Sequence, residues 1–377
     1  MNTICLKVRL LPTKAQETKL TETLETCRHL YNRFLAQRKA AYEQTGKSPS
    51  HYEQNNCLPA WKLENEYLTR VHSQVLQDVA QRVDRSFQNF FRRCKEAKEK
   101  PGFPRFKGRG WYDSFTFAQS GFSLGNDSVT LSKIGTVQAI VHRQIAGKVK
   151  QCTIRRQNQK WFACFSIEVP DAPLPPTGAA IGIDVGLTSF ATFSTGEQVE
   201  NPRFFRHDEK ALAKAQRRLS KFEKGTAQRR KARKAVARIH ERIRNRRHNF
   251  THQTARKIVN RCDKIAVEKL NVKGMTKNHC LAKSIGDAAW SQFRTVLAHK
   301  AASAGRQYAE VNPAYTSQDC SGCGLRAKKK LSERWHFCPV CGTSLDRDEN
   351  AALNILAAGL RCIGNQSVEA PAFMRGE

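Results

Sequence analysis

Residues 179–197, AAIGIDVGLTSFATFSTGE, form the stretch that decides the fold of the second half of the chain. Apolar and small residues alternate at its start, which predicts a short strand through Ile181 and Ile183 and a second strand through Phe190. Asp184 therefore falls in the middle of an apolar strand. A charged carboxylate is unfavourable there unless something compensates its charge.

Two glycines share the strand face of Asp184. Side chains alternate along a strand, so Gly182 and Gly186 lie on the same face as the aspartate. Because they have no side chains, we expect these glycines to leave room beside the carboxylate for the backbone of a ligand.

Further carboxylates occupy unusual positions later in the chain. Glu268 ends the predicted buried strand of DKIAVEKLNV (263–272), and Asp346 and Asp348 open a predicted helix, ENAALNILAAGL (349–360). An aspartate before a helix can be an ordinary cap, so each site alone has a structural explanation. Three such sites in one basic chain indicate divalent-metal binding instead. Carboxylates suit Mg²⁺, and two ions ~3.5–4 Å apart can activate water against a phosphodiester.

Four clustered cysteines precede that helix: Cys320, Cys323, Cys338 and Cys341. Their spacing is Cys-x2-Cys, fourteen residues, Cys-x2-Cys, which is typical of a zinc site. Four thiolates leave no open coordination position, so we expect a structural zinc ion and not a catalytic one. For so short a hairpin, metal binding supplies most of the folding free energy, on the order of 10 kcal/mol.

The composition points to a polyanionic partner. The 377 residues include 65 Lys and Arg against 33 Asp and Glu, a formal net charge of +32, and nucleic acid is the obvious candidate. Membrane binding is disfavoured because no apolar run approaches ~18 residues and no secretory signal is evident. We expect nine scattered cysteines to be thiols in a reducing cytoplasm: Cys5, Cys27, Cys57, Cys94, Cys152, Cys164, Cys262, Cys280 and Cys362.

Two segments are candidates for nucleic-acid contact. Residues 208–261 hold 19 Lys and Arg against 4 Asp and Glu, and they predict a helical hairpin that faces nucleic acid. Its candidate contacts are Arg229, Arg230, Lys231, Arg233 and Lys234. The loop KPGFPRFKGRGWYDSFTF (100–117) either packs its aromatic rings internally or, with Arg105 and Lys107, forms a platform for bases and phosphates.

The chain resembles the TnpB (OrfB) proteins of bacterial insertion sequences, which are relatives of the type V CRISPR effector nucleases. The resemblance spans roughly residues 3 to 357 and includes two motifs of the first half, QVLQDVAQRVDRSFQNFF and KPGFPRFKGRGWYDSFTF. Its most specific motifs are GIDVGLTSFATF, AVEKLNVKGM, YTSQDCSGCG, HFCPVCG and DRDENAALNIL.

The resemblance implies a multidomain α+β and α/β fold, in which an RNase H-like RuvC nuclease domain carries a zinc-ribbon insertion. A wedge-type β-barrel interrupted by a helical recognition domain is implied before it. The expected boundaries are 1–19 and 104–172 for the barrel, 20–103 for the helical domain, 178–315 and 344–358 for the nuclease domain, 316–343 for a target-nucleic-acid-binding zinc ribbon, and 359–377 for a flexible tail.

The resemblance also implies a function and its residues. It assigns catalysis and Mg²⁺ or Mn²⁺ binding to Asp184, Glu268 and Asp348, and it leaves Asp346 to cap the helix or support the site indirectly. It assigns the structural zinc to the four cysteines. The implied activity is metal-dependent cleavage of double-stranded DNA beside a transposon-adjacent motif, guided by RNA from the transposon end, in the bacterial cytoplasm or nucleoid.

Other hypotheses remain open from the sequence. A transposase that joins strands would use the same metal chemistry with a 3′-hydroxyl nucleophile, and a non-cleaving RNA-guided repressor would bind DNA without hydrolysing it. The intact carboxylates argue against the repressor. A plain zinc-ribbon transcription factor would leave Asp184 and Glu268 unexplained.

Overall fold

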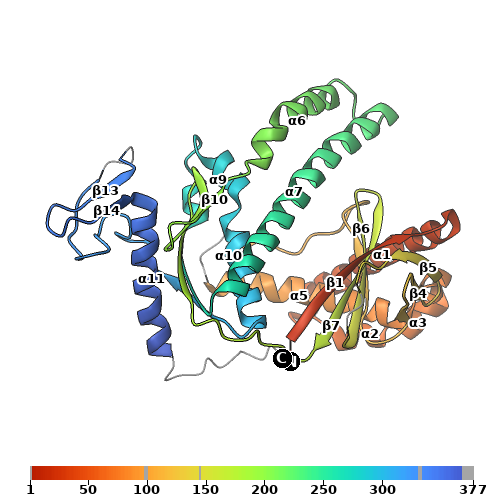
Figure 1. Cartoon of the computed structure of the whole chain (residues 1–377). Coiled ribbons are helices and arrows are strands. Elements are labelled where there is room, and N and C mark those ends of the chain that lie inside the picture. The colour runs from red at the N-terminus through yellow and green to blue at the C-terminus, as the bar shows by residue number, and fades with distance from the viewer. Residues whose placement is uncertain (1, 97–100, 144–145, 330–332, 367–377) are drawn as a thin grey trace. The chain divides into compact units, whose positions relative to one another are not determined.

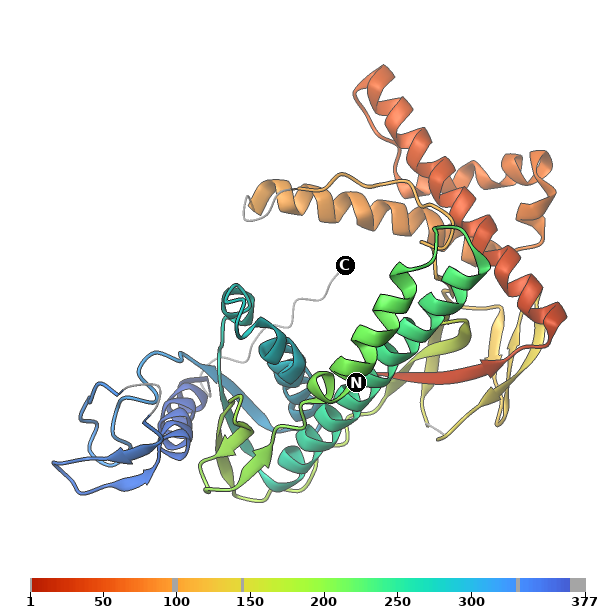
Figure 2. The same cartoon turned by 90° about the horizontal axis from the view of Figure 1, so that it is seen from above.

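A computed structural model of the chain describes residues 2–96, 101–143, 146–329 and 333–366 (Figures 1 and 2). The chain divides into two compact units, Met1–Pro170 and Asp171–Glu377. The boundary falls at the start of a proline-rich stretch, PDAPLPPTG (170–178). None of the described helices is both long and apolar enough to cross a membrane.

The first unit contains a seven-stranded antiparallel sheet with the order β2-β6-β7-β1-β5-β4-β3. Its strands are β1 (Asn2–Leu11), β2 (Ser114–Phe117), β3 (Phe122–Leu124), β4 (Ser128–Leu131), β5 (Gly135–Ile140), β6 (Lys148–Gln157) and β7 (Lys160–Val169). Phe122 on one edge strand contacts Phe117 on the other, with ring centroids 6.3 Å apart. The sheet therefore curls until its edges meet, although no pairing of β2 with β3 closes it among the described strands.

Five helices lie between β1 and β2: α1 (Lys14–Thr45), α2 (His51–Asn56), α3 (Leu58–Glu64), α4 (Glu66–Thr69) and α5 (Ser73–Glu96). Helix α1 begins after Thr13, because Thr13 and Gln16 form a reciprocal capping box.

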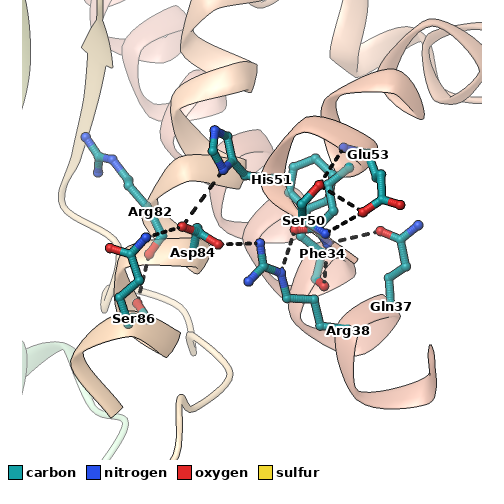
Figure 3. Close-up of polar contacts among 11 residues, drawn as sticks. Phe34, Gln37, Arg38, Ser50, His51, Glu53, Arg82, Asp84 and Ser86 are labelled. Carbon is teal, nitrogen blue, oxygen red and sulfur yellow. Dashed lines mark hydrogen bonds and ion pairs between the residues drawn. The ribbon is translucent and has the colours of Figure 1, made fainter. Parts of the chain in front are cut away.

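A buried cation joins three of these helices (Figure 3). Arg38 of α1, only 4% exposed, donates to Asp84 of α5 and to Gln54 of α2, each at 2.9 Å. A buried guanidinium without such partners would be strongly unfavourable, so this network fixes how α1, α2 and α5 pack.

The second unit is built on a five-stranded sheet with the order β10-β9-β8-β11-β12. Its strands are β8 (Ala180–Asp184), β9 (Ser189–Phe193), β10 (Gln198–Glu200), β11 (Lys264–Glu268) and β12 (Gln307–Val311). β8, β11 and β12 run parallel to one another. β9 pairs antiparallel with β8 on one side and with β10 on the other. Asp184 is the last residue of β8, so the prediction that it lies in mid-strand is wrong, while Glu268 ends β11 as predicted.

Helices and a small ribbon complete this unit. They are α6 (Phe204–Ser220), α7 (Ala227–Arg261), α8 (Val272–Met275), α9 (Ala282–Ala288), α10 (Trp290–Ser303), the strands β13 (Trp335–Phe337) and β14 (Ser344–Asp346), and α11 (Arg347–Gln366). The predicted helical hairpin is confirmed as α6 and α7. Helix α11 continues to Gln366, so residues 359–366 are helical and not a flexible tail; residues 367–377 lie outside the described part.

Two glycines allow α11 to lie directly on the sheet. A Cβ added at Gly182 of β8 would lie 2.0 Å from the Ala352 carbonyl oxygen, and one at Gly359 would lie 2.2 Å from Ala266 Cβ. The prediction that Gly182 leaves room for a ligand is therefore wrong, because the backbone of α11 occupies that space. This close approach brings the first turn of α11 to the end of β8.

One added methyl group at Gly359 should destabilise the second unit. In Gly359→Ala the new Cβ overlaps Ala266, so helix and strand must separate, and we expect a loss of about 1–3 kcal/mol. Gly364→Ala is a matched control on the same helix, because nothing lies within 4 Å of its added Cβ. Denaturant unfolding compares the two variants; equal midpoints would show that the tight contact relaxes without cost.

Candidate metal centres

The three predicted catalytic carboxylates come from three different elements of the second unit. Asp184 and Glu268 end the neighbouring parallel strands β8 and β11, whose preceding residues Ile183 and Val267 are paired. The carboxyl ends of parallel strands meet at one edge of a sheet, which places these two side chains together. Asp348 lies in the first turn of α11, which packs on the same strands.

The electrostatics show that these carboxylates share one environment. Burial, and then the negative charges of Glu268 and Asp348, raise the pKa of Asp184 well above its ordinary value. Burial also raises the pKa of Glu268, although the Thr316 hydroxyl, which donates to Glu268 Oε1 at 2.6 Å, opposes this shift. Like charges on buried acids are unfavourable unless a cation is present.

The residues present fit a hard divalent cation. All three donors are carboxylates, the ligand type that Mg²⁺ and Mn²⁺ prefer. Among the described residues the four cysteines, and not these carboxylates, form a compact group of possible ligands, whose donor atoms all lie within 4.8 Å of one another.

The sequence reasoning missed the arginine inside this acidic motif. The side chain of Arg347 is 14% exposed, and its Nη2 lies 3.3 Å from Asp348 Oδ1. Its charge also opposes the rise in the pKa of Asp184. The prediction that Asp346 caps the helix is confirmed, because its Oδ1 accepts from the backbone N–H groups of Asp348 and Glu349 at 2.8 and 3.4 Å.

The four cysteines converge as their spacing predicts. Sγ atoms lie 3.5 Å apart in the pairs Cys320–Cys341 and Cys323–Cys338. Hydrogen bonds from Thr343, whose hydroxyl lies 3.0 Å from the Cys341 sulfur, lower the pKa of that thiol to about 6 and favour the thiolate. Four convergent sulfurs, two of them (Cys320 and Cys341) with a lowered pKa, fit a tetrahedral zinc ion.

Two asparagines tie the cysteine cluster to α11. Asn350, fully buried, donates to the Asp319 carbonyl at 2.8 Å and accepts from the Ser321 N–H at 2.9 Å. Asn354 donates to the carbonyls of Asp319 and Thr316. The two amides in this largely apolar stretch of helix are the signal by which the sequence could have revealed the link.

The candidate nucleic-acid contacts differ in their availability. Arg230, Lys231, Arg233 and Lys234 are exposed on α7. Arg229 instead donates to the carbonyls of Leu219 and Phe222, so it holds the turn between α6 and α7.

The loop before β2 combines both predicted behaviours. Phe103 packs edge-on against Phe87, whereas Trp111 is 80% exposed. Arg105 is exposed, while the backbone of Lys107 is bound to Asn32 of α1.

Comparison with known proteins identifies the family. The profile of OrfB_IS605, described as "Probable transposase", matches residues 164–279. A protein of Streptomyces pristinaespiralis named "Putative RNA-guided DNA endonuclease" is 37% identical over 94% of this chain and 89% of its own length. The chain belongs to the TnpB (OrfB) family. A second relative in this family, "Putative RNA-guided DNA endonuclease InsQ" of Escherichia coli K12, is 33% identical over 94% of this chain and 91% of its own.

Other comparisons concern parts of the fold of this TnpB-family chain. A profile described as "Cas12f1-like, TNB domain" matches residues 290–355, which include the cysteine cluster. A helix-turn-helix profile matches residues 1–47, where the structure has strand β1 and the single long helix α1. The chain shares its fold with a solved structure, the Cas12f1-sgRNA-target DNA complex, with a TM-score of 0.60 at 12% identity, over 94% of this chain and 98% of that one.

Neutralising Asp184 should stabilise the metal-free protein at neutral pH. The pKa of Asp184 in the folded protein lies above the ordinary value of 3.8, so the folded state binds a proton at this carboxylate more tightly than the unfolded state does. The stability of the fold therefore falls as pH rises from about 4. We therefore expect Asp184→Asn to raise the midpoint of thermal unfolding in EDTA at pH 7. Mg²⁺ should stabilise the wild type and have a smaller effect on this variant.

Asp263 provides a control of opposite sign. Desolvation raises the pKa of Asp263, but hydrogen bonds from Gly178 and Thr177, together with the charge of Arg306, outweigh it and lower the pKa. Asp263→Asn should therefore destabilise the protein at pH 7, an effect that fades as pH falls. A lower unfolding midpoint for Asp184→Asn would contradict the proposed charge repulsion.

Removing one thiolate should remove the zinc and leave the rest of the protein folded. We expect Cys338→Ser to lose about one zinc per chain, because three remaining sulfurs no longer close the site. Helix α11 has its own contacts with the sheet, so circular dichroism should change little. Cys362→Ser, at an exposed cysteine of α11, is the matched control and should retain zinc by atomic emission. Undiminished zinc in Cys338→Ser would exclude the four-thiolate site.

Proposed function

We propose that this chain is an RNA-guided DNA endonuclease encoded by an insertion sequence, and that it hydrolyses target DNA with Mg²⁺ or Mn²⁺. The observation that carries the proposal is the meeting of Asp184, Glu268 and Asp348 from three elements. Two arginines beside Asp348, Arg347 and Arg334, only partly offset the buried negative charge. The names of the two full-length relatives support the same activity.

The proposed chemistry follows from the donors. Asp184, Glu268 and Asp348 would hold the ions, which supply an activated water and stabilise the leaving oxygen. Thr316 orients Glu268 through its hydroxyl, and Asp346 fixes the first turn that carries Asp348. Arg347, through its contact with Asp348, reduces repulsion among the acids.

The domain assignments follow the same proposal. The curled sheet of the first unit would be the wedge-type barrel, formed by 1–19 and 104–172, and its helices the recognition domain, 20–103. The five-stranded sheet and α11 would form the RuvC-like domain, 178–315 and 344–358. The cysteine segment 316–343 would be a zinc ribbon that binds the target.

The proposed partners are a guide RNA from the transposon end and double-stranded target DNA beside a transposon-adjacent motif. The exposed basic face of α7 and the net charge of +32 support polyanionic partners. The proposed location is the bacterial cytoplasm or nucleoid, where both nucleic acids occur.

Single carboxylate substitutions test the activity. We expect Asp184→Ala, Glu268→Ala and Asp348→Ala each to reduce cleavage of a guide-matched duplex by at least about 100-fold, because each removes charge that stabilises the transition state. Guide and target binding should persist in gel-shift assays. Asp346→Ala removes a helix cap and should have a much smaller effect. Full activity in Glu268→Ala would refute the metal assignment, and strand joining without RNA would favour a transposase.

Neutralising the exposed face of α7 should weaken binding without changing sequence preference. We expect replacement of Arg230, Lys231, Arg233 and Lys234 with Gln to reduce the slope of log affinity against log salt by about 0.9 per lost duplex phosphate contact. Arg229 is left intact because it holds the turn before α7. An unchanged slope would show that this face is ordinary solvated surface.

A further inference from the structure

We propose that Trp335 and Phe337 form a stacking platform that holds unpaired bases of a single DNA strand beside the carboxylate centre. The inference rests on the proposed nuclease function and adds to it a site for one partner. Both rings belong to β13, in the β13–β14 ribbon at the N-terminal end of α11 (Figure 1).

The two rings are exposed on one face of the strand. Trp335 is 61% exposed and Phe337 is 62% exposed, whereas His336 between them is buried. Side chains alternate along a strand, so both rings point away from the ribbon interior. Val340, also exposed, follows Phe337 by three residues in the chain. Exposed aromatic groups gathered on so small a ribbon indicate an interaction surface.

The indole ring is held by its edge. Trp335 Nε1 donates to Ser344 Oγ of β14 at 2.8 Å, which fixes the ring and leaves its polar group satisfied. A ring fixed in this way loses little side-chain entropy when a base stacks on it. Base stacking on aromatic side chains tolerates any sequence, as a guide-directed nuclease requires.

The backbone connects this platform directly to the carboxylates. Trp335 is paired with Asp346, the residue that caps the first turn of α11. The Arg347 N–H donates to the Arg334 carbonyl at 2.8 Å, and Arg334 Nη1 lies 3.7 Å from Asp348 Oδ2. A strand whose bases stack on β13 would therefore place its backbone close to the cleavage centre.

The surrounding charges favour a nucleic acid over an apolar protein or a membrane. Arg334, next to Trp335 in the chain, is exposed and can bind a phosphate, as can the exposed Lys328 of the same cysteine segment, and Glu333 is an exposed charge of opposite sign. In a duplex the base faces are already stacked on one another. The platform should therefore prefer a single strand, such as one released when a guide RNA pairs with its target.

The test uses the full-length chain and a fluorescein-labelled oligo(dT) of about 15 nucleotides. We expect the double variant Trp335→Ala/Phe337→Ala to bind it about tenfold more weakly, with duplex DNA binding nearly unchanged. Trp335→Phe should bind nearly as well as the wild type, whereas Trp335→Leu, which is apolar but cannot stack, should not. Val340→Ala is the control for a general loss of apolar surface. Zinc content establishes that each variant retains its ribbon.

The outcomes separate this inference from the proposed function. Stacking-dependent oligo(dT) binding in a protein that cleaves no DNA would support the platform and refute the nuclease. The protein could instead cleave DNA under guide direction while the wild type and the double variant bind oligo(dT) equally. That result would support the nuclease function and overturn the platform. Wild-type affinity in Trp335→Leu would also overturn it, since the surface would then be merely apolar.

Discussion

The second unit depends on the direct contact between the backbone of α11 and strand β8. Only a residue without a side chain at 182 permits the Ala352 carbonyl to come so close, and Gly359 does the same against β11. This contact sets the height and the rotation of α11 above the sheet. Since Asp348 is in its first turn, the contact also decides where the third carboxylate lies.

That placement brings three carboxylates together, and the fold offsets their mutual repulsion only in part. Asp184 and Glu268 are desolvated side by side, and Asp348 adds to the repulsion. Arg347 and the Thr316 hydroxyl oppose it without removing it. A buried acidic cluster that lowers the stability of the ion-free protein is typical of a centre that binds cations. Cation binding to such a centre restores that stability.

The cysteine ribbon is bound to the same helix, α11, that carries the third carboxylate. Asn350 and Asn354 bind backbone carbonyls just before Cys320, while Asp346 ends β14 and caps α11. Thr316, which orients Glu268, lies four residues before Cys320 in this connection. The cysteine cluster and the carboxylates are therefore mechanically linked, so a change in the ribbon should alter the first turn of α11.

The sequence by itself determined the features that depend on local spacing. These are the four-cysteine cluster, the strand ending at Glu268, the Asp346 cap and the basic hairpin of α6 and α7. Only the tertiary structure showed that α11 fills the space above Gly182, that Arg347 enters the acidic centre, and that Asn350 anchors the ribbon. The reason is physical: a turn or a helix cap is set by neighbouring residues, whereas the contents of a gap depend on which distant segment packs into it.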